Sequence, residues 1–196
     1  QIGANDGERF DILNIYIKKY KVKSLLVEPI KENFNKLKNN YSNCNFIDFE
    51  NSAISVNNEI FKLFKVNSKY VNMYSNHIPG ITSSDIKHLL KHGVSKHHIS
   101  SENVNTISIE KLLMKYKLKN LDLLFIDAEG YDGKIVIDFL KLDIFKPIII
   151  LEYIHIGNEI FKDLIAQLEK KKYIFFSINE NLVCYPENDL RNINFN

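Results

Sequence analysis

Helix-like and strand-like segments alternate along the whole chain, and this order constrains the fold more than any other feature. In one segment apolar side chains recur at helical spacing, and in the next they form a short continuous run. No proline-rich or serine-rich linker interrupts the 196 residues, and no internal repeat is present. Such an order is typical of α/β proteins. We therefore predict one α/β domain over residues 1–196, with a mostly parallel sheet and helices on both of its faces.

The periodicity gives approximate bounds for these elements. Helices are predicted over residues 8–20, 30–41, 83–92, 108–116, 131–142 and 158–172. Strands are predicted over residues 24–27, 45–54, 59–66, 121–126 and 147–151. Two further strands, residues 173–177 and 182–185, flank Asn179-Glu180-Asn181, and this turn-rich junction predicts a C-terminal antiparallel hairpin.

Two segments depart from the regular alternation. Gln1-Ile2-Gly3 resembles the end of a buried strand followed by a glycine turn, so we expect an opening strand whose first half is missing. Residues 67–98 are largely polar, with Pro79-Gly80 as a turn, and are predicted to form an insertion. This insertion is long enough to act as a lid over a substrate.

The composition excludes several classes of protein. Lys and Arg number 26 and Asp and Glu number 24, a formal net charge of +2 that demands neither a nucleic-acid nor an anionic-membrane partner. The longest apolar run, near residues 148–151, is far shorter than the roughly 20 residues of a membrane-spanning helix. Cys44 and Cys184 match no disulfide or zinc pattern, so we expect a cytoplasmic protein.

The first strand ends carry side chains suited to a nucleotide-like cofactor, because ligands of open α/β sheets bind where strands end. Gly3-Ala4-Asn5-Asp6-Gly7 offers a tight turn at Gly3 and close backbone approach to a ligand at Gly7. Glu28 follows one strand–helix unit later, where an acidic residue can accept both ribose hydroxyls. Asn51-Ser52-Ala53 suits an adenine. The alternatives are an ordinary strand-to-helix connection and, for Glu28, a solvated carboxylate.

The later strand ends are acidic. Asp127, Glu129 and Asp132 follow the apolar strand over residues 121–126, and such charges are costly unless they bind a cation, a proton or a polar ligand. Glu152 and His155 follow the next strand, and either could act as a general base toward a substrate hydroxyl.

Taken together, these residues resemble the FkbM family of S-adenosylmethionine-dependent methyltransferases. The shared segments follow the family's order over nearly the whole chain: QIGANDG, LLVEPIKENFNKLKNN, NSAIS, SIEKLL, LDLLFIDAEGYD and PIIILEY. The resemblance implies a Rossmann-like class I methyltransferase domain. Departures are Ala128 where a branched residue is common, Asp132 where Glu is usual, and the missing half of the opening strand.

The resemblance also implies roles for single residues. Gly3, Asn5 and Gly7 would shape the cofactor loop, Glu28 would hold the ribose, and Ser52 and Ala53 would lie by the adenine. Asp127 and Glu129 would face the sulfonium and the acceptor. The residues themselves favour a single nucleotide-sized cofactor, because the chain lacks the third glycine and the second half of a dinucleotide-binding enzyme. It also lacks an Arg or Lys in residues 3–7 for a sugar diphosphate.

No bound metal is predicted. His88 and His92 are four residues apart on an expected helix, but Lys87 and Lys91 would repel a cation, which favours a solvated helix face. Mg²⁺ at the carboxylates of residues 127, 129 and 152 is the alternative left open. The same carboxylates could instead hold the amino group of the cofactor's methionine moiety.

The predicted reaction is methyl transfer from S-adenosylmethionine to a hydroxyl of a sugar or another polyhydroxylated metabolite. The proposed catalytic residues are Asp127, Glu129, Glu152 and His155, and the expected partner is a small-molecule or glycan acceptor. The alternative is an inactive nucleoside- or sugar-binding module on the same fold, which need not keep these four side chains together. The sequence gives no indication of the oligomeric state.

Overall fold

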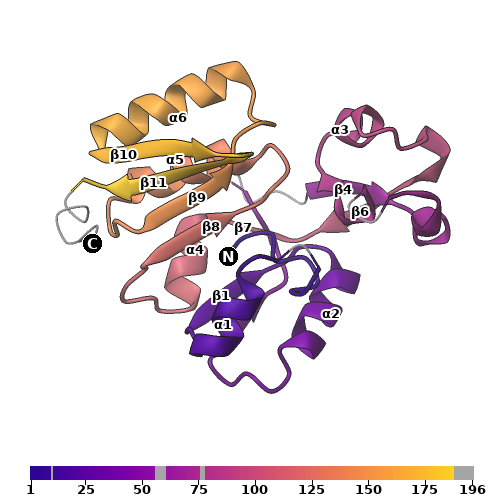
Figure 1. Cartoon of the computed structure of the whole chain (residues 1–196), viewed down its shortest axis with the longest axis horizontal. Coiled ribbons are helices and arrows are strands. Elements are labelled where there is room, and N and C mark those ends of the chain that lie inside the picture. The colour runs from indigo at the N-terminus through magenta and orange to yellow at the C-terminus, as the bar shows by residue number, and fades with distance from the viewer. Residues whose placement is uncertain (10, 56–60, 76–77, 188–196) are drawn as a thin grey trace. The chain divides into compact units, whose positions relative to one another are not determined.

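The computed structural model describes residues 1–9, 11–55, 61–75 and 78–187 (Figure 1). The chain divides into two compact units. The first unit comprises Gln1–Ala53 and Asn58–Thr106, and the second comprises Ile54–Asn57 and Ile107–Asn196. Helices and small mixed sheets make up both units, so the α/β class is confirmed. Among the described residues, no helix combines the length and the apolar character that crossing a membrane requires.

The first unit begins with a small parallel sheet. Strand β1 (Ser24–Val27) pairs in parallel with β2 (Ile47–Glu50), and Ile2 adds a parallel bridge to Val27 on the other edge of β1. Helices α1 (Asn14–Tyr20) and α2 (Lys31–Asn40) pack against this sheet. Their apolar faces and the sheet share one core, made of Ala4, Ile17, Leu26, Phe34, Leu37, Tyr41 and Ile47.

Helix α1 starts six residues later than predicted, at Asn14 rather than at residue 8. The Asp6 carboxylate accepts hydrogen bonds from the backbone N–H groups of Glu8 and Arg9, at 3.0 and 2.9 Å. Asp11 in the same way accepts the N–H of Leu13 at 2.9 Å. These side-chain turns give the backbone partners outside a helix, and this delays its start.

The predicted strand over residues 45–54 is broken. It forms β2 and a two-residue strand, β3 (Ala53–Ile54), which pairs with β7 (Thr106–Ile107). The break lies at Asn51, whose side-chain amide donates to the carbonyl oxygens of Glu28 and Pro29 at 2.9 and 3.0 Å. These bonds connect the break to the two residues that follow β1.

Residues 61–104 of the first unit form an antiparallel sheet in which β4 (Phe61–Val66) lies between β5 (Thr82–Ser83) and β6 (Ile99–Val104). The predicted insertion lies here and carries the 3₁₀ helices η1 (Ser68–Met73), η2 (Ile78–Gly80) and η3 (Lys96–His98) and helix α3 (Ile86–Lys91). Residues 59–60 of the predicted strand lie outside the described residues. The insertion has its own core, made of Val66, Ile78, Ile81, Leu89 and Val94.

The second unit contains a four-stranded sheet in the order β10-β11-β9-β8. The strands are β8 (Leu123–Ile126), β9 (Ile148–Glu152), β10 (Tyr173–Ile178) and β11 (Asn181–Pro186). Strands β8 and β9 are parallel, and β9, β11 and β10 are antiparallel neighbours. The predicted C-terminal hairpin is thus confirmed, with Asn179 at a φ of 53° in its turn.

Three helices of the second unit follow the predicted periodicity closely. They are α4 (Ile109–Lys115), α5 (Asp132–Leu142) and α6 (Asn158–Lys170). Helix α4 begins after Ser108, whose hydroxyl accepts the backbone N–H of Lys111 at 3.2 Å. Helices α5 and α6 pack against each other. That residues 1–196 form a single domain stays a prediction.

Candidate functional site

The glycine loop of residues 3–7 turns sharply at the end of the opening segment. Gly3, Asn5 and Gly7 have positive φ angles of 78°, 49° and 70°. The backbone N–H groups of Gly3 and Ala4 both donate to the carbonyl oxygen of Val27, at 3.0 Å. The loop is therefore fixed to the end of β1.

Gly7 lies against the core of the first unit. A Cβ atom at this position would lie 2.7 Å from the ring of Tyr41 and would overlap the side chain of Leu37. Close packing against α2 therefore requires a glycine here, in addition to the positive φ. Its predicted contact with the cofactor stays a prediction.

Glu28 lies at the centre of the first unit's strand ends. Its side chain is buried, with 4% of the residue's surface exposed. One carboxylate oxygen accepts the N–H of Asn5 at 3.0 Å, and the other accepts the N–H of Ile30 at 2.8 Å. Glu28 is thus no solvated carboxylate, because it links the glycine loop to the start of α2. Its role toward a ribose stays a prediction.

The next strand end brings in a carboxylate that the sequence analysis missed. Glu50, the last residue of β2, is buried and accepts the hydroxyl hydrogen of Ser52 at 2.7 Å. Its carbonyl oxygen accepts the N–H of Glu28 at 3.0 Å. Ala53 donates its N–H to the carbonyl oxygen of Asn105 at 2.8 Å. An acidic last residue of a predicted strand was the signal that could have identified Glu50.

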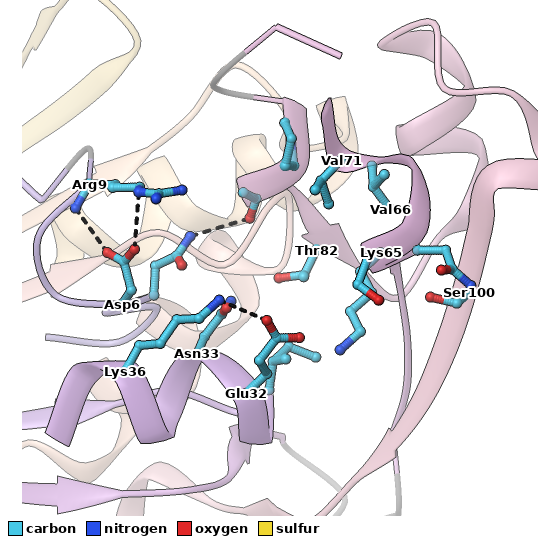
Figure 2. Close-up of a pocket in the computed structure, with 16 residues that line it drawn as sticks. Asp6, Arg9, Glu32, Asn33, Lys36, Lys65, Val66, Val71, Thr82 and Ser100 are labelled. Atoms are coloured by element: carbon cyan, nitrogen blue, oxygen red, sulfur yellow. Dashed lines mark hydrogen bonds and ion pairs between the residues drawn. The ribbon is translucent and has the colours of Figure 1, made fainter. Parts of the chain in front are cut away.

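A cavity of about 240 Å³ opens in the first unit between the glycine loop, α2 and the insertion (Figure 2). Of the predicted cofactor residues in this unit, Asn5 alone lines it. The other lining residues are Asp6, Arg9, Ile30, Glu32, Asn33, Lys36, Lys65, Val66, Asn67, Ser68, Val71, Pro79, Gly80, Thr82 and Ser100. Apart from Asn5, none of the residues that line the cavity was predicted from the sequence as a site residue.

In the second unit, the acidic loop after β8 is organised by Asp132. This residue is fully buried, and its carboxylate accepts the N–H groups of Ala128 and Gly130, both at 3.0 Å. Glu129 and Gly130 have φ angles of 50° and 94°. A Cβ atom on Gly130 would lie 3.0 Å from the carbonyl oxygen of His155, so a glycine lets this loop approach the end of β9.

Three of the predicted catalytic side chains meet in the second unit. The ligand atoms of Glu129, Glu152 and His155 all lie within 4.8 Å of one another. The Nε2 atom of His155 is 3.9 Å from Oε1 of Glu152. The other oxygen of Glu152, Oε2, is buried and has no hydrogen-bond partner among the described residues. Such a group can take up a proton, an ammonium group or a cation.

We call Glu129, Glu152 and Asp132 the acidic cluster, and the pKa values of all three are raised toward or above neutral pH. Burial raises the pKa of Glu129 to about 8, and the charges of Asp127 and Glu180 add to this effect. Burial, followed by the charge of Glu129, raises the pKa of Glu152 to about 8. Burial also raises the pKa of Asp132 to about 7, against the opposing effect of its backbone hydrogen bonds. Side chains with pKa values between about 7 and about 8 can exchange protons with a substrate near neutral pH.

Asp127, the fourth predicted catalytic residue, is not part of the group formed by Glu129, Glu152 and His155. Asp127 keeps an exposed surface, although the surrounding protein and then Glu180 raise its pKa. His88 and His92 have ring centres 4.7 Å apart on α3 and its C-terminal cap. Partial burial, followed by the charge of Lys91, lowers the pKa of His88.

Comparison with models of protein families shows which family the chain belongs to. The family model described as "Methyltransferase FkbM domain" matches residues 1–175. No curated protein and no solved structure matches the chain. Because the match covers most of the 196 residues, the chain belongs to the FkbM methyltransferase domain family.

The packing of Gly7 predicts a large loss of stability on substitution. Gly7→Ala should lower the free energy of unfolding by about 2–5 kcal/mol, because it adds steric overlap to the strain of a positive φ. The matched control is Gly93→Ala, where φ is 79° and nothing lies within 4 Å of the added Cβ. It should cost only about 1–2 kcal/mol. Urea unfolding measures both, and equal losses would contradict the packing role.

The acidic cluster predicts that stability falls as the pH rises. Folding raises the pKa values of Glu129 and Glu152 from 4.5 to about 8, so in this window the folded chain holds protons that the unfolded chain has released. The free energy of unfolding should therefore decrease between pH 5 and pH 8. Glu152→Gln should flatten this decrease and raise the melting temperature at pH 8 by a few degrees.

The matched control for this pH series is Glu169→Gln, a change at an exposed position of α6. Melting curves of the three proteins at pH 5 and pH 8 provide the measurement. A pH dependence that Glu152→Gln leaves unaltered would show that the cluster does not carry the raised pKa values.

Proposed function

We propose that this member of the FkbM family transfers a methyl group from S-adenosylmethionine to a hydroxyl of a sugar or another polyhydroxylated small molecule. The observation that carries this proposal is that ligand atoms of Glu129, Glu152 and His155 lie within 4.8 Å of one another, and that a buried oxygen of Glu152 has no hydrogen-bond partner in the part of the chain that the structure describes. A hydroxyl acceptor must lose a proton as it is methylated, and this cluster offers groups that can take it up.

The proposal includes a single Rossmann-like class I domain. The parallel pairs β1–β2 and β8–β9 and the antiparallel hairpin after β9 support this arrangement. In such a domain, the loops that follow the parallel strands share one ligand-binding edge. A cytoplasmic location, a small-molecule or glycan acceptor and the lack of nucleic-acid or membrane partners belong to the same proposal.

The residues of the first unit fit the adenosine part of the cofactor. Gly3 and Asn5 shape the loop, Glu28 is the ribose carboxylate, and Ser52 and Ala53 are assigned to the adenine. The support is the way Glu28 binds the loop and α2 at once, through Asn5 and Ile30.

The residues of the second unit are assigned to the reaction itself. When bound, S-adenosylmethionine supplies an electrophilic methyl group, so the protein has only to align the acceptor and accept its proton. Glu152 or His155 takes the hydroxyl proton while the acceptor oxygen forms its bond to the methyl carbon and the sulfur–carbon bond breaks. Asp127 and Glu129 orient the acceptor hydroxyls. The carboxylates of Glu129 and Glu152 also have donor oxygens suited to Mg²⁺, unlike the imidazole of His155, but the proposed reaction does not need this ion.

The ribose assignment predicts the effect of Glu28→Gln. The amide keeps the size of the side chain but loses the charge, so the affinity for S-adenosylhomocysteine should fall by about 10- to 100-fold. The matched control is Glu32→Gln, an exposed position on α2 whose affinity should stay at the level of the unchanged protein. Isothermal titration calorimetry gives the affinities, and circular dichroism checks the fold. Equal affinities of a folded Glu28→Gln variant and the control would refute the assignment.

The catalytic assignment predicts the effect of Glu152→Gln and His155→Ala. Loss of the proton acceptor should lower turnover by about 10²–10⁴-fold while the affinity for S-adenosylhomocysteine changes little. The assay follows transfer of radiolabelled methyl groups into glycans, small hydroxylated metabolites, proteins and RNA. Label that mild base releases would indicate a carboxyl ester, and label found only in protein or RNA would contradict a sugar acceptor. Cofactor binding without transfer to any acceptor would favour an inactive binding module.

A further inference from the structure

We propose that the edge strand β10 is the surface through which two copies of this chain pair, joining their sheets edge to edge about a two-fold axis at Phe176. Every residue of the proposed interface belongs to the second unit. The pairing does not depend on the methyltransferase reaction, and β10 contributes none of the candidate site residues.

Strand β10 forms one edge of the four-stranded sheet. It pairs with β11 over all six of its residues, and no strand in the described part of the chain pairs with its other side (Figure 1). Proteins usually protect such an edge with a charge, a proline or a bulge, and Tyr173–Ile178 has none of these. The equally long edge strand β6, by contrast, carries Glu102 and is mostly polar. Strand β10 is therefore an edge open to a further strand.

Three apolar side chains of β10 are exposed on one face of the sheet. The exposed fractions of Ile174, Phe176 and Ile178 are 45%, 47% and 52%. These residues alternate along the strand and so point to the same face, whereas Tyr173 points to the other face and is buried. The ring of Phe176 stacks on that of Tyr185, with the centroids 5.9 Å apart and the planes at 7°. The apolar strip is thus held in place by the chain's own packing.

The pairing of β10 with β11 shows which backbone groups are available at the edge. In an antiparallel pair, residues that exchange hydrogen bonds with the partner strand alternate with residues that point away from it. Tyr173 lies opposite Pro186, which has no N–H group, so these two residues cannot exchange both bonds. The alternation therefore directs the N–H and C=O groups of Tyr173, Phe175 and Ser177 to the free edge.

These groups allow a two-fold pairing in which like side chains meet. When Phe175 of one copy bonds with Ser177 of the other, Phe176 lies opposite its own equivalent. Ile174 of each copy then lies opposite Ile178 of the other. The exposed apolar side chains of both copies fall on one face, in the positions without backbone bonds, where opposed side chains are closest.

The charges at the two ends of β10 favour the same register. Lys172 precedes the strand and Glu180 follows it in the hairpin turn, and both are exposed. In the proposed register, Lys172 of each copy lies beside Glu180 of the other. A shift by two residues would instead place Ile178 opposite Lys172 or Ile174 opposite Glu180. Apolar and charged side chains therefore match a second copy of the same strand in one register.

The proposed interface adjoins the acidic cluster. The carbonyl oxygen of Glu180 accepts the N–H of Tyr153 at 3.0 Å, and Asn181 is the register partner of Glu152. Pairing therefore brings Lys172 of the second copy to the turn that lies beside the end of β9.

Sedimentation velocity of the full chain measures the pairing. The unchanged protein should show a monomer–dimer equilibrium that shifts with concentration. Phe176→Lys should weaken the dimer by about tenfold or more, because it replaces an aromatic contact at the two-fold axis with two opposed charges. The matched control is Ile15→Lys, at an exposed apolar position of α1, which should leave the dimer unchanged. Circular dichroism checks the fold of both variants.

A charge exchange tests the register without altering the apolar strip. Lys172→Glu and Glu180→Lys should each weaken the dimer by about three- to tenfold, because each places like charges at both ends of the pairing. A mixture of these two variants should pair as strongly as the unchanged protein, since every end contact then joins opposite charges. Lys162→Glu, an exposed position of α6, is the control and should have no effect.

Cross-linking locates the two-fold axis. Phe176→Cys should form a disulfide-linked dimer on mild oxidation, because opposed Cα atoms without backbone bonds are about 4.5 Å apart, within disulfide range. Ser177→Cys is the matched control, since residue 177 does not lie opposite its own equivalent. Non-reducing gel electrophoresis compares both variants with the unchanged protein.

The outcomes decide for or against the pairing. A monomer at every concentration, a dimer that a folded Phe176→Lys variant retains, or a charge-exchange mixture that pairs no better than either variant alone overturns it. If Phe176→Lys does not fold, the charge-exchange mixture decides. Cross-linking at residue 177 rather than 176 overturns the register. None of these measurements involves S-adenosylmethionine, so the methyltransferase proposal can fail while the pairing stands.

Discussion

A buried carboxylate organises the functional strand end of the first unit, and the surrounding structure depends on it. One carboxylate oxygen of Glu28 accepts the backbone N–H of Asn5 in the glycine loop, and the other accepts the backbone N–H of Ile30 at the start of α2. Both are backbone N–H groups that would otherwise be left without a partner beside a buried strand end. The negative charge at the start of α2 is also favourable to the helix dipole. One side chain thus sets the positions of a strand, a loop and a helix relative to one another.

The second unit uses the same device at the end of β8. The carboxylate of Asp132 accepts the N–H groups of Ala128 and Gly130 and so closes the loop that carries Asp127 and Glu129. In both units a buried acid accepts backbone N–H groups in the connection between a strand and the helix that follows it. The loop is thereby stiff enough to hold polar groups at a strand end, where a flexible connection would leave their positions undefined.

Local signals made much of the fold predictable. Ser108 caps α4, and Asn179 provides the turn between β10 and β11, so these bounds could be inferred from nearby residues. The start of α1 could not, because Asp6 and Asp11 redirect N–H groups in a segment whose apolar spacing remains helical. Strand β6 was missed because the sequence Ile99–Val104 is mostly polar and becomes a strand only through pairing with β4, more than thirty residues earlier in the chain.

The candidate site was predictable to a similar extent. Carboxylates directly behind apolar strands identified Asp127, Glu129 and Glu152, because such placement is recognisable within a few residues. The cavity was not predictable, since Asn33, Thr82 and Ser100 are separated in sequence and become neighbours only when the insertion folds beside α2. The burial of Glu28 likewise depends on the folded loop rather than on its sequence neighbours.

The antiparallel pairing of β4 and β6 has a consequence for how this chain can vary. Val66 and Ile99 are register partners, so the segment between them, which also contributes β5 to this sheet, begins and ends at adjacent positions. The entropy cost of closing a segment between fixed, neighbouring ends increases only slowly with the length of the segment. The length of this segment, which forms one wall of the cavity, can therefore change at little cost in closure entropy, while the strand ends that carry Glu28 and its partners are left as they are. Divergence in ligand preference would then be concentrated in this one exchangeable stretch.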